Sequence, residues 1–148
     1  MKIVIASDHA GYQGKEAIKQ TLDRQGIAYE DLGPASEDSV DYPDYAERVG
    51  EAVTRGEAQR GILVCGSGIG MAIAANKVPG IRAALAWNEE TARLARQHND
   101  ANVVAVGART TAPEVIDEIV RAFLKTDFEG GRHAQRVEKI ARLEQKKG

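Results

Sequence analysis

The chain has 148 residues, of which 43% are hydrophobic and 28% charged, a size and composition typical of one globular domain with a single core. Its formal net charge of -2 gives no electrostatic reason to bind nucleic acid or an anionic membrane, so we expect neither as a partner. One cysteine excludes an internal disulfide, and no apolar run reaches the ~20 residues that cross a bilayer, so we expect a cytoplasmic protein.

Short apolar runs alternate with longer amphipathic stretches along the chain. Each apolar run ends at glycine, proline or polar residues, and a segment with helical spacing follows it. We expect strands at 2–7, 27–32, 61–65, 81–86 and 102–106, and helices at 13–25, 42–55, 71–77, 89–98, 111–124 and 132–147. Thr111 to Glu114 resembles a capped helix start with proline in the first turn. The repeated strand–helix order predicts a doubly wound, five-stranded parallel sheet of the Rossmann-like α/β class, with an extra C-terminal helix.

The last helix, at about 131–147, has no strand before or after it. Its apolar residues Val137, Ile140 and Leu143 share one side. That side either packs on the chain's own sheet or crosses to a second copy of the chain, and the spacing alone does not decide. No repeat or linker divides the sequence, so we take 1–148 as a single domain.

The segment GILVCGSGIGMAIAAN combines a buried strand, a tight turn and a helix start. Its strand ends at Cys65, and the glycine-rich stretch Gly66 to Gly70 follows. Glycines let backbone approach a ligand, and amides at a helix start attract an anion and favour a thiolate. Taken singly, each feature has an ordinary explanation. The cysteine could be a small buried side chain, and the glycines could let the helix pack closely on the sheet. Together, at the carboxyl end of a parallel strand, they predict an active site.

Further polar residues follow other strands of the predicted sheet. Asp8 and His9 come after the first strand and Arg109 after the fifth, so they should join the cysteine at the edge where α/β sheets bind ligands. His98 and Asn99 instead end a helix and precede a strand. They should lie near the opposite edge and reach such a site only from a neighbouring subunit. This predicts a site shared between subunits.

The sequence gives no sign of a metal site. The three histidines, His9, His98 and His133, show no ligand spacing, and one cysteine cannot build a thiolate zinc site. Each histidine lies in a polar loop or near a helix end, where surface histidines are common. We therefore expect no metal.

Arg132 and Arg136 lie four residues apart on one helix face and, with Arg109, could hold a phosphate. A solvated basic helix explains the same residues. The usual phosphate-site motifs do not fit, since Met71 stands where a cysteine phosphatase needs an arginine, and the Walker and dinucleotide patterns are absent. A thiol beside an oxyanion cradle remains, which suits proton abstraction next to the carbonyl of a phosphorylated substrate.

The sequence resembles the type B ribose-5-phosphate isomerases nearly end to end, through SDHAG, DYPDYA, CGSGIGMAIAANK, GIRAA, RQHNDANV and EGGRHAQRV. This family includes galactose- and allose-6-phosphate isomerases. The resemblance implies a metal-independent aldose–ketose isomerase without a cofactor. It would convert ribose 5-phosphate to ribulose 5-phosphate through a cis-enediolate, as a homodimer or tetramer with shared sites. Two alternatives are a hexose-6-phosphate isomerase of the same family and a sugar-phosphate-binding domain without catalytic activity.

The resemblance also implies roles for individual residues. Cys65 would be the base that moves a proton between C2 and C1, and Ser67 would assist the thiol or the sugar hydroxyls. His98 would open the sugar ring, with His9 as another candidate. The implied substrate contacts are Asp8, His9, Tyr42 and Asn99 for the sugar, the backbone of Gly66, Ser67, Gly68, Ile69 and Gly70 for the enediolate, and Arg109, Arg132 and Arg136 for sugar and phosphate.

Overall fold

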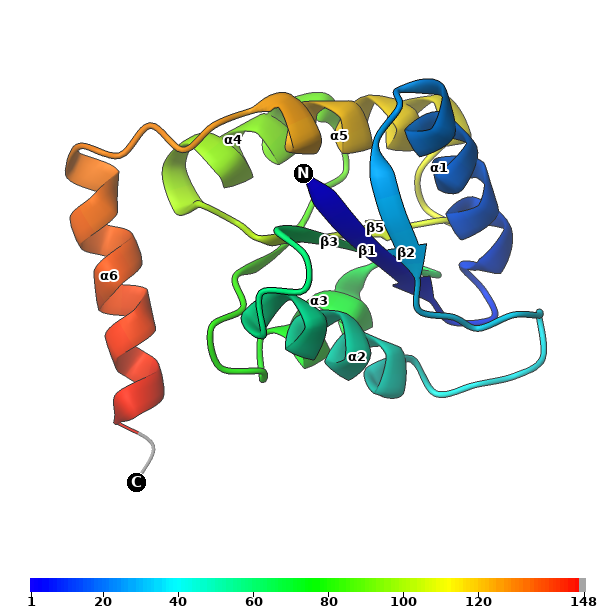
Figure 1. Cartoon of the computed structure of the whole chain (residues 1–148), viewed down its shortest axis with the longest axis horizontal. Coiled ribbons are helices and arrows are strands. Elements are labelled where there is room, and N and C mark those ends of the chain that lie inside the picture. The colour runs from blue at the N-terminus through cyan, green and yellow to red at the C-terminus, as the bar shows by residue number, and fades with distance from the viewer. Residues whose placement is uncertain (147–148) are drawn as a thin grey trace.

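The computed structural model describes residues 1–146, and its strands and helices follow one another in the expected order (Figure 1). Most boundaries lie within two residues of those expected. The strands are β1 (Lys2–Ser7), β2 (Ala28–Asp31), β3 (Arg60–Cys65), β4 (Ala83–Leu85) and β5 (Val103–Gly107). The helices are α1 (Tyr12–Arg24), α2 (Tyr42–Thr54), α3 (Ile69–Ala75), α4 (Glu89–Asn99), α5 (Pro113–Lys125) and α6 (Arg132–Gln145).

The five strands form one parallel sheet in the order β2-β1-β3-β5-β4. Ser7 at the end of β1 pairs with Val64, and Cys65 at the end of β3 pairs with Gly107 at the end of β5. The carboxyl ends of these three strands therefore meet at one edge of the sheet. The predicted doubly wound parallel fold is confirmed.

Helices cover both faces of the sheet, with α1, α4 and α5 on one face and α2 and α3 on the other (Figure 1). The side chains of β3 contribute to both cores, because successive side chains of a strand point to opposite faces of the sheet. Ile62 and Val64 enter the core under α1, α4 and α5, whereas Leu63 and Cys65 enter the core under α2 and α3. The cysteine therefore lies on the same face as α3.

Helix α3 begins at Ile69, two residues before the expected start at Met71. Gly68 precedes it with a φ of 81°, a left-handed conformation that glycine adopts without steric strain. The chain thus passes from β3 into the helix through only three residues. The glycine-rich turn is shorter than the sequence pattern indicated.

Strand β4 is shorter than the expected range 81–86, and side chains supply some of the hydrogen bonds near its start. The N–H of Arg82 donates to Asn102 Oδ1 at 2.8 Å, and the N–H of Ala83 donates to Asn76 Oδ1 at 2.7 Å. Asn102 directly precedes β5, the strand that pairs with β4, whereas Asn76 follows the end of α3. The pairing between β4 and β5 begins at Ala83, opposite Val103.

The start of α5 also differs from the expected one. Ala112, not Thr111, is the residue that caps the helix, and no side-chain hydrogen bond supports the cap. The N–H of Thr111 donates to the carbonyl of Gly107 at 3.0 Å and so completes the turn after β5. The predicted capping role of Thr111 was wrong, although Pro113 does open the helix.

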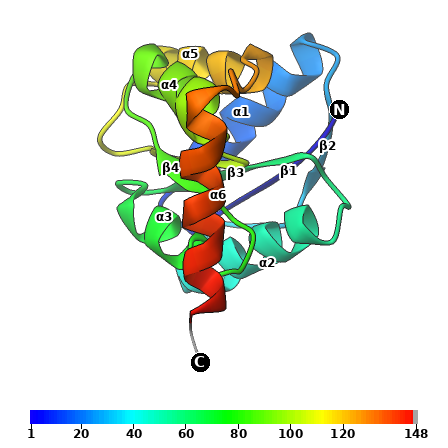
Figure 2. The ribbon, with the colours of Figure 1, turned by 90° about the vertical axis from the view of Figure 1, so that its left-hand side faces the viewer.

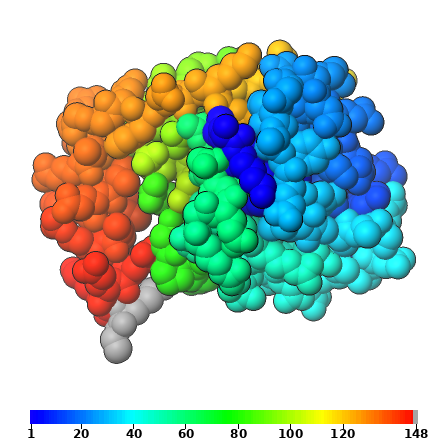
Figure 3. Space-filling view, viewed as in Figure 1, coloured from blue at the N-terminus to red at the C-terminus, as the bar shows by residue number. Residues whose placement is uncertain are grey.

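Helix α6 stands apart from the layered body, from α4 at one end to the level of α2 and α3 at the other (Figures 1 and 2). Ile140 and Leu143 are 43% and 59% exposed, so the chain's own sheet does not cover this apolar side. Figure 3 shows an opening between part of α6 and the body, while Glu144 accepts the N–H of Gly80 at 2.8 Å. Position 147, the expected end of the helix, lies outside the described residues. Of the helices in this part of the chain, none is both long and apolar enough to cross a membrane.

Candidate active site

An open cleft of about 630 Å³ lies at the carboxyl edge of the sheet, a volume within the range of small-molecule sites. Segments far apart in the sequence meet there, because β1, β3 and β5 end side by side. The residues that line it are Asp8, His9, Ala10, Tyr42, Cys65, Gly66, Ser67, Ile69, Gly70, Ile73, Arg109 and Thr110. Most of the candidate residues named from the sequence therefore share one cleft.

Cys65 is buried and its thiol lies against the glycine-rich turn. The N–H of Gly68 donates to Cys65 Sγ at 3.2 Å, a contact that a negatively charged sulfur accepts more strongly than a neutral one. Ser67 Oγ accepts the N–H of Ile69 at 3.2 Å. This contact leaves the Ser67 hydroxyl proton available to a ligand. Thiol and hydroxyl are thus positioned by the backbone of the same turn.

The backbone of the turn lies close against the end of β5. A Cβ at Gly68 would lie 2.9 Å from the carbonyl carbon of Val106, and a Cβ at Gly107 would lie 2.6 Å from that of Ser67. Gly70 lines the cleft from the first turn of α3, where amide groups have no acceptor inside the helix. The cradle expected from the glycine pattern is therefore built of closely packed backbone.

Asp8 and His9 enter the cleft from the turn after β1. The N–H of Val40 donates to His9 Nδ1 at 3.2 Å, so a neutral imidazole carries its proton on Nε2. The Asp8 carboxylate is buried and accepts the N–H of Gly11 at 2.9 Å. His9 can therefore donate a hydrogen bond to a ligand, and Asp8 can accept one with its remaining lone pairs.

Arg109 and Tyr42 complete the cleft from two other segments. The N–H of Arg109 donates to the carbonyl of Gly66 at 2.9 Å, and its side chain passes close to that glycine. The Tyr42 ring lies over Gly70, where a Cβ would come within 2.6 Å of the ring. The lack of a side chain at Gly70 thus admits the Tyr42 ring, which a larger residue would displace. Arg109 brings a positive charge to the cleft, as a phosphate site requires.

Three lining residues were not predicted from the sequence: Ala10, Ile73 and Thr110. Ile73 lies one helical turn after Ile69, and both side chains are exposed. A helix predicted to start at position 69 would have placed the two residues on the same face. Thr110 follows Arg109 in the turn after β5. The position of Thr110 just after the predicted fifth strand could have indicated that it lines the cleft.

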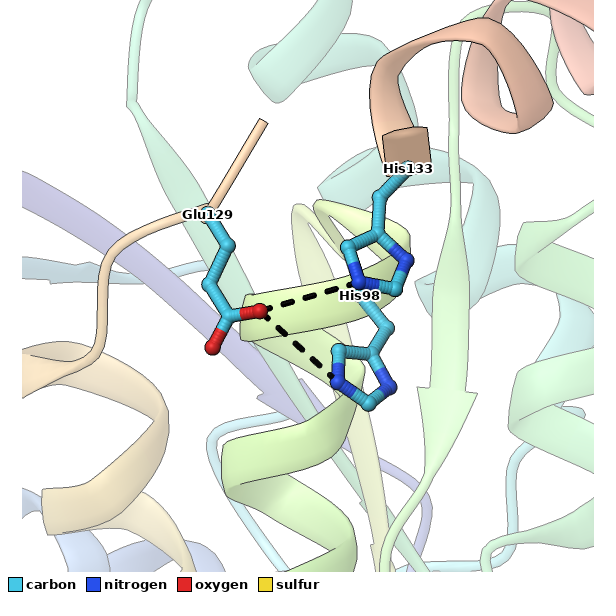
Figure 4. Close-up of side chains that lie close together, drawn as sticks. All are labelled: His98, Glu129 and His133. Carbon is cyan, nitrogen blue, oxygen red and sulfur yellow. Dashed lines mark ion pairs between the residues drawn. The ribbon is translucent and has the colours of Figure 1, made fainter. Parts of the chain in front are cut away.

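His98 lies outside the cleft, in a group with Glu129 and His133 (Figure 4). The two imidazole rings stack with centroids 4.3 Å apart and an interplanar angle of 11°. Glu129 Oε1 lies 3.9 Å from His98 Nε2 and 3.6 Å from His133 Nε2. Burial lowers the pKa of His133 below its ordinary value, and the neighbouring His98 lowers it further. Spacing along the sequence, which indicated no group of metal-ligating residues, did not reveal this cluster.

The cluster and the cleft lie at opposite edges of the sheet. His98 precedes the amino end of β5 at Val103, whereas Cys65 pairs with Gly107 at the other end. The strand between these ends spans roughly 13 Å. Arg132 and Arg136 are exposed on α6 and do not line the cleft. Within one chain, His98, Asn99 and these two arginines are therefore separate from Cys65.

Comparison with known proteins supports the resemblance seen in the sequence. The family model described as Ribose/Galactose Isomerase matches residues 3–140. The chain is 46% identical over 146 residues to ribose-5-phosphate isomerase B of Escherichia coli, covering 99% of this chain and 98% of that protein. Solved structures of ribose-5-phosphate isomerase B are also similar. That from Clostridium thermocellum has a TM-score of 0.98 at 50% identity and full coverage of both chains.

A further solved structure, from Mycoplasma genitalium, is ribose-5-phosphate isomerase B with bound ribulose-5-phosphate. It has a TM-score of 0.93 and 44% identity, over 98% of this chain and 97% of that one. Similarity of this extent covers β1 through α6 and includes every segment that forms the cleft. The chain belongs to the ribose/galactose isomerase family.

Proposed function

We propose that this protein interconverts ribose 5-phosphate and ribulose 5-phosphate, a step of pentose phosphate metabolism, with Cys65 as the base. The contact between the Gly68 N–H and Cys65 Sγ, inside a cleft that also holds Arg109, is the observation that carries the proposal. The similarity to proteins named ribose-5-phosphate isomerase B supports the choice of substrate. A mechanism based on a reduced thiol fits a cytoplasmic enzyme.

The reaction moves one proton between adjacent carbons. The Cys65 thiolate takes the proton from C2 of the open-chain aldose, and the electron pair of that C–H bond forms the C1–C2 double bond as charge moves to O1. Backbone amides of the Gly66–Gly70 turn then hold the enediolate, each well-placed donor contributing on the order of 3 kcal/mol. Cys65 returns the proton to C1, while the hydroxyl proton passes from O2 to O1. Ser67 is positioned to assist that transfer.

We also propose that each site is shared between two copies of the chain in a homodimer or tetramer. One copy supplies Cys65 and Arg109, and its partner supplies the residues that lie at the far edge of its own sheet: His98, Asn99, Arg132 and Arg136. Exposed apolar side chains support this assembly, since Ile69 and Ile73 border the cleft and α6 leaves its apolar side uncovered. The chain is then one isomerase domain over 1–148 whose last helix crosses to the partner.

Mixing two inactive variants tests the shared site. Cys65→Ala and His98→Ala should each be inactive alone. Coexpressed, they should regain about one quarter of the wild-type specific activity, because half of randomly formed dimers are mixed and each mixed dimer holds one intact site. Specific activity of the purified mixture is the measurement. If mixing restores nothing although mixed dimers form, each site is built within one chain.

Initial rates at equal enzyme concentration test the substrate. We expect the highest kcat/KM for ribose 5-phosphate, compared with allose 6-phosphate and galactose 6-phosphate. A preference for either hexose would keep Cys65 and the enediolate chemistry but assign the protein to the hexose branch of the family. Ligand-induced stabilisation without turnover of any of the three would instead indicate a sugar-phosphate-binding domain.

A further inference from the structure

Three segments bring metal-ligating atoms together at the amino edge of the sheet. His98 comes from the end of α4, Glu129 from the connection after α5, and His133 from the start of α6. One nitrogen or oxygen atom of each lies within 4.8 Å of the other two (Figure 4). The isomerisation proposed above does not use Glu129 or His133.

The separations are close to those around a small divalent ion. Two ligand atoms bound at 2.0–2.2 Å to a tetrahedral Zn²⁺ lie about 3.3–3.6 Å apart. Glu129 Oε1 already lies 3.6 Å from one imidazole nitrogen and 3.9 Å from the other. The Glu129 carboxylate therefore needs to move by only a few tenths of an ångström to reach the spacing expected between two ligands of one ion.

The surrounding structure holds the His133 ring and anchors the backbone of Glu129, while the exposed side chains of Glu129 and His98 can turn. The His133 side chain is only 11% exposed, and its backbone N–H donates to the carbonyl of Gly130 at 3.0 Å. The N–H of Glu129 donates to the carbonyl of Gln97 at 3.0 Å, which ties this connection to α4. His98 is 40% exposed, so its ring has room to leave the stacked position and aim Nε2 at an ion.

We propose that His98, Glu129 and His133 form a binding site for a divalent transition-metal ion of the Zn²⁺ type. Two imidazoles and one carboxylate favour such ions over Mg²⁺ or Ca²⁺, which prefer oxygen ligands. Three protein ligands leave a fourth position open to water. The ion links α6 to α4. It also occupies His98 Nε2, so it inhibits ring opening, a consequence that rests on the function proposed above.

Titration of the full-length chain with Zn²⁺ and Co²⁺ tests the site, at a pH where imidazole is neutral. Glu129→Gln and His133→Ala should each weaken Zn²⁺ binding on the order of 100-fold. Loss of a residue that only hydrogen-bonds to a metal ligand already costs about 10- to 100-fold in affinity, and these two residues bind the ion directly. Glu138→Gln is the matched control, because it makes the same chemical change on an exposed α6 residue outside the cluster. The control should bind Zn²⁺ like the wild type and keep its activity. Circular dichroism shows whether each variant is folded.

Two results would overturn the site. One is unchanged Zn²⁺ affinity in Glu129→Gln, which removes an exposed carboxylate and should not impair folding. The other is loss of the ion in Cys65→Ser together with a thiolate charge-transfer band in the Co²⁺ spectrum of the wild type, which would place the ion on the cysteine instead.

Turnover measurements test the inhibition separately. Zn²⁺ should inhibit the wild type and Glu138→Gln, a chelator should restore both, and Glu129→Gln should need about 100-fold more Zn²⁺ for the same inhibition. Binding without inhibition would contradict the assignment of ring opening to His98 and leave the metal site standing. Absence of turnover in metal-free protein would contradict the proposed function, whereas the Co²⁺ spectrum would still report the site.

Discussion

Replacing Cys65 by alanine should lower kcat for ribose 5-phosphate by about 1000-fold, within the range that general acid–base groups contribute. The variant loses the only group at the end of β3 that can take a proton from carbon, whereas Arg109, His9 and the backbone turn remain in place. Substrate affinity should therefore change only a few-fold. Steady-state rates and isothermal titration with the same sugar phosphate measure the two quantities.

Cys65→Ser is the control for shape. Its hydroxyl nearly matches the thiol in size and can still accept the Gly68 N–H, but it is a far weaker acid than a thiol and offers almost no anion near neutral pH. We expect it to be as inactive as the alanine variant. Near-normal kcat in either variant would show that another group is the base.

Replacing Gly68 by alanine should destabilise the protein by about 2–5 kcal/mol and remove activity. Its φ of 81° is strained for any residue with a Cβ, and this Cβ would also lie 2.6 Å from Leu85 Cδ1 and 2.9 Å from the carbonyl carbon of Val106. Relief of that collision moves the turn off β5 and the Gly68 amide off the Cys65 sulfur. Urea-induced unfolding and initial rates are the measurements.

Gly26→Ala separates the two causes. Gly26 has a similar φ of 67°, but a Cβ there would meet nothing within 4 Å. Only the conformational strain, about 1–2 kcal/mol, should appear, with activity unchanged. Equal losses of stability in the two variants would mean that the packing of the turn against β5 contributes nothing.

The sequence predicted the sheet and most of the cleft because both follow from local order. Apolar runs such as Lys2–Ser7 and Arg60–Cys65 mark buried strands, and parallel strands align their carboxyl ends. Asp8 and Arg109 each follow such a run and Cys65 ends one, so their shared edge could be inferred from the sequence alone.

Contacts made across long sequence separations could not be inferred in the same way. His98 and His133 stack because the connection after α5 returns to the end of α4, and no periodicity encodes that return. The edges of elements depended on single hydrogen bonds, such as that from Thr111 to Gly107, which displaced the expected cap. The early start of α3 depended on the left-handed conformation of Gly68.

Direct backbone contact between the Gly66–Gly70 turn and β5 bears on how the cleft would respond to inhibitors. Because the backbone of the turn already packs against the backbone of β5, we expect its amides to be in position before a ligand binds. Binding then requires little ordering of the protein. A planar anion that imitates the enediolate meets these amides at once, whereas either sugar phosphate meets them fully only during the reaction. Planar, anionic sugar phosphates that imitate the enediolate should therefore bind more tightly than analogues of the closed sugar ring.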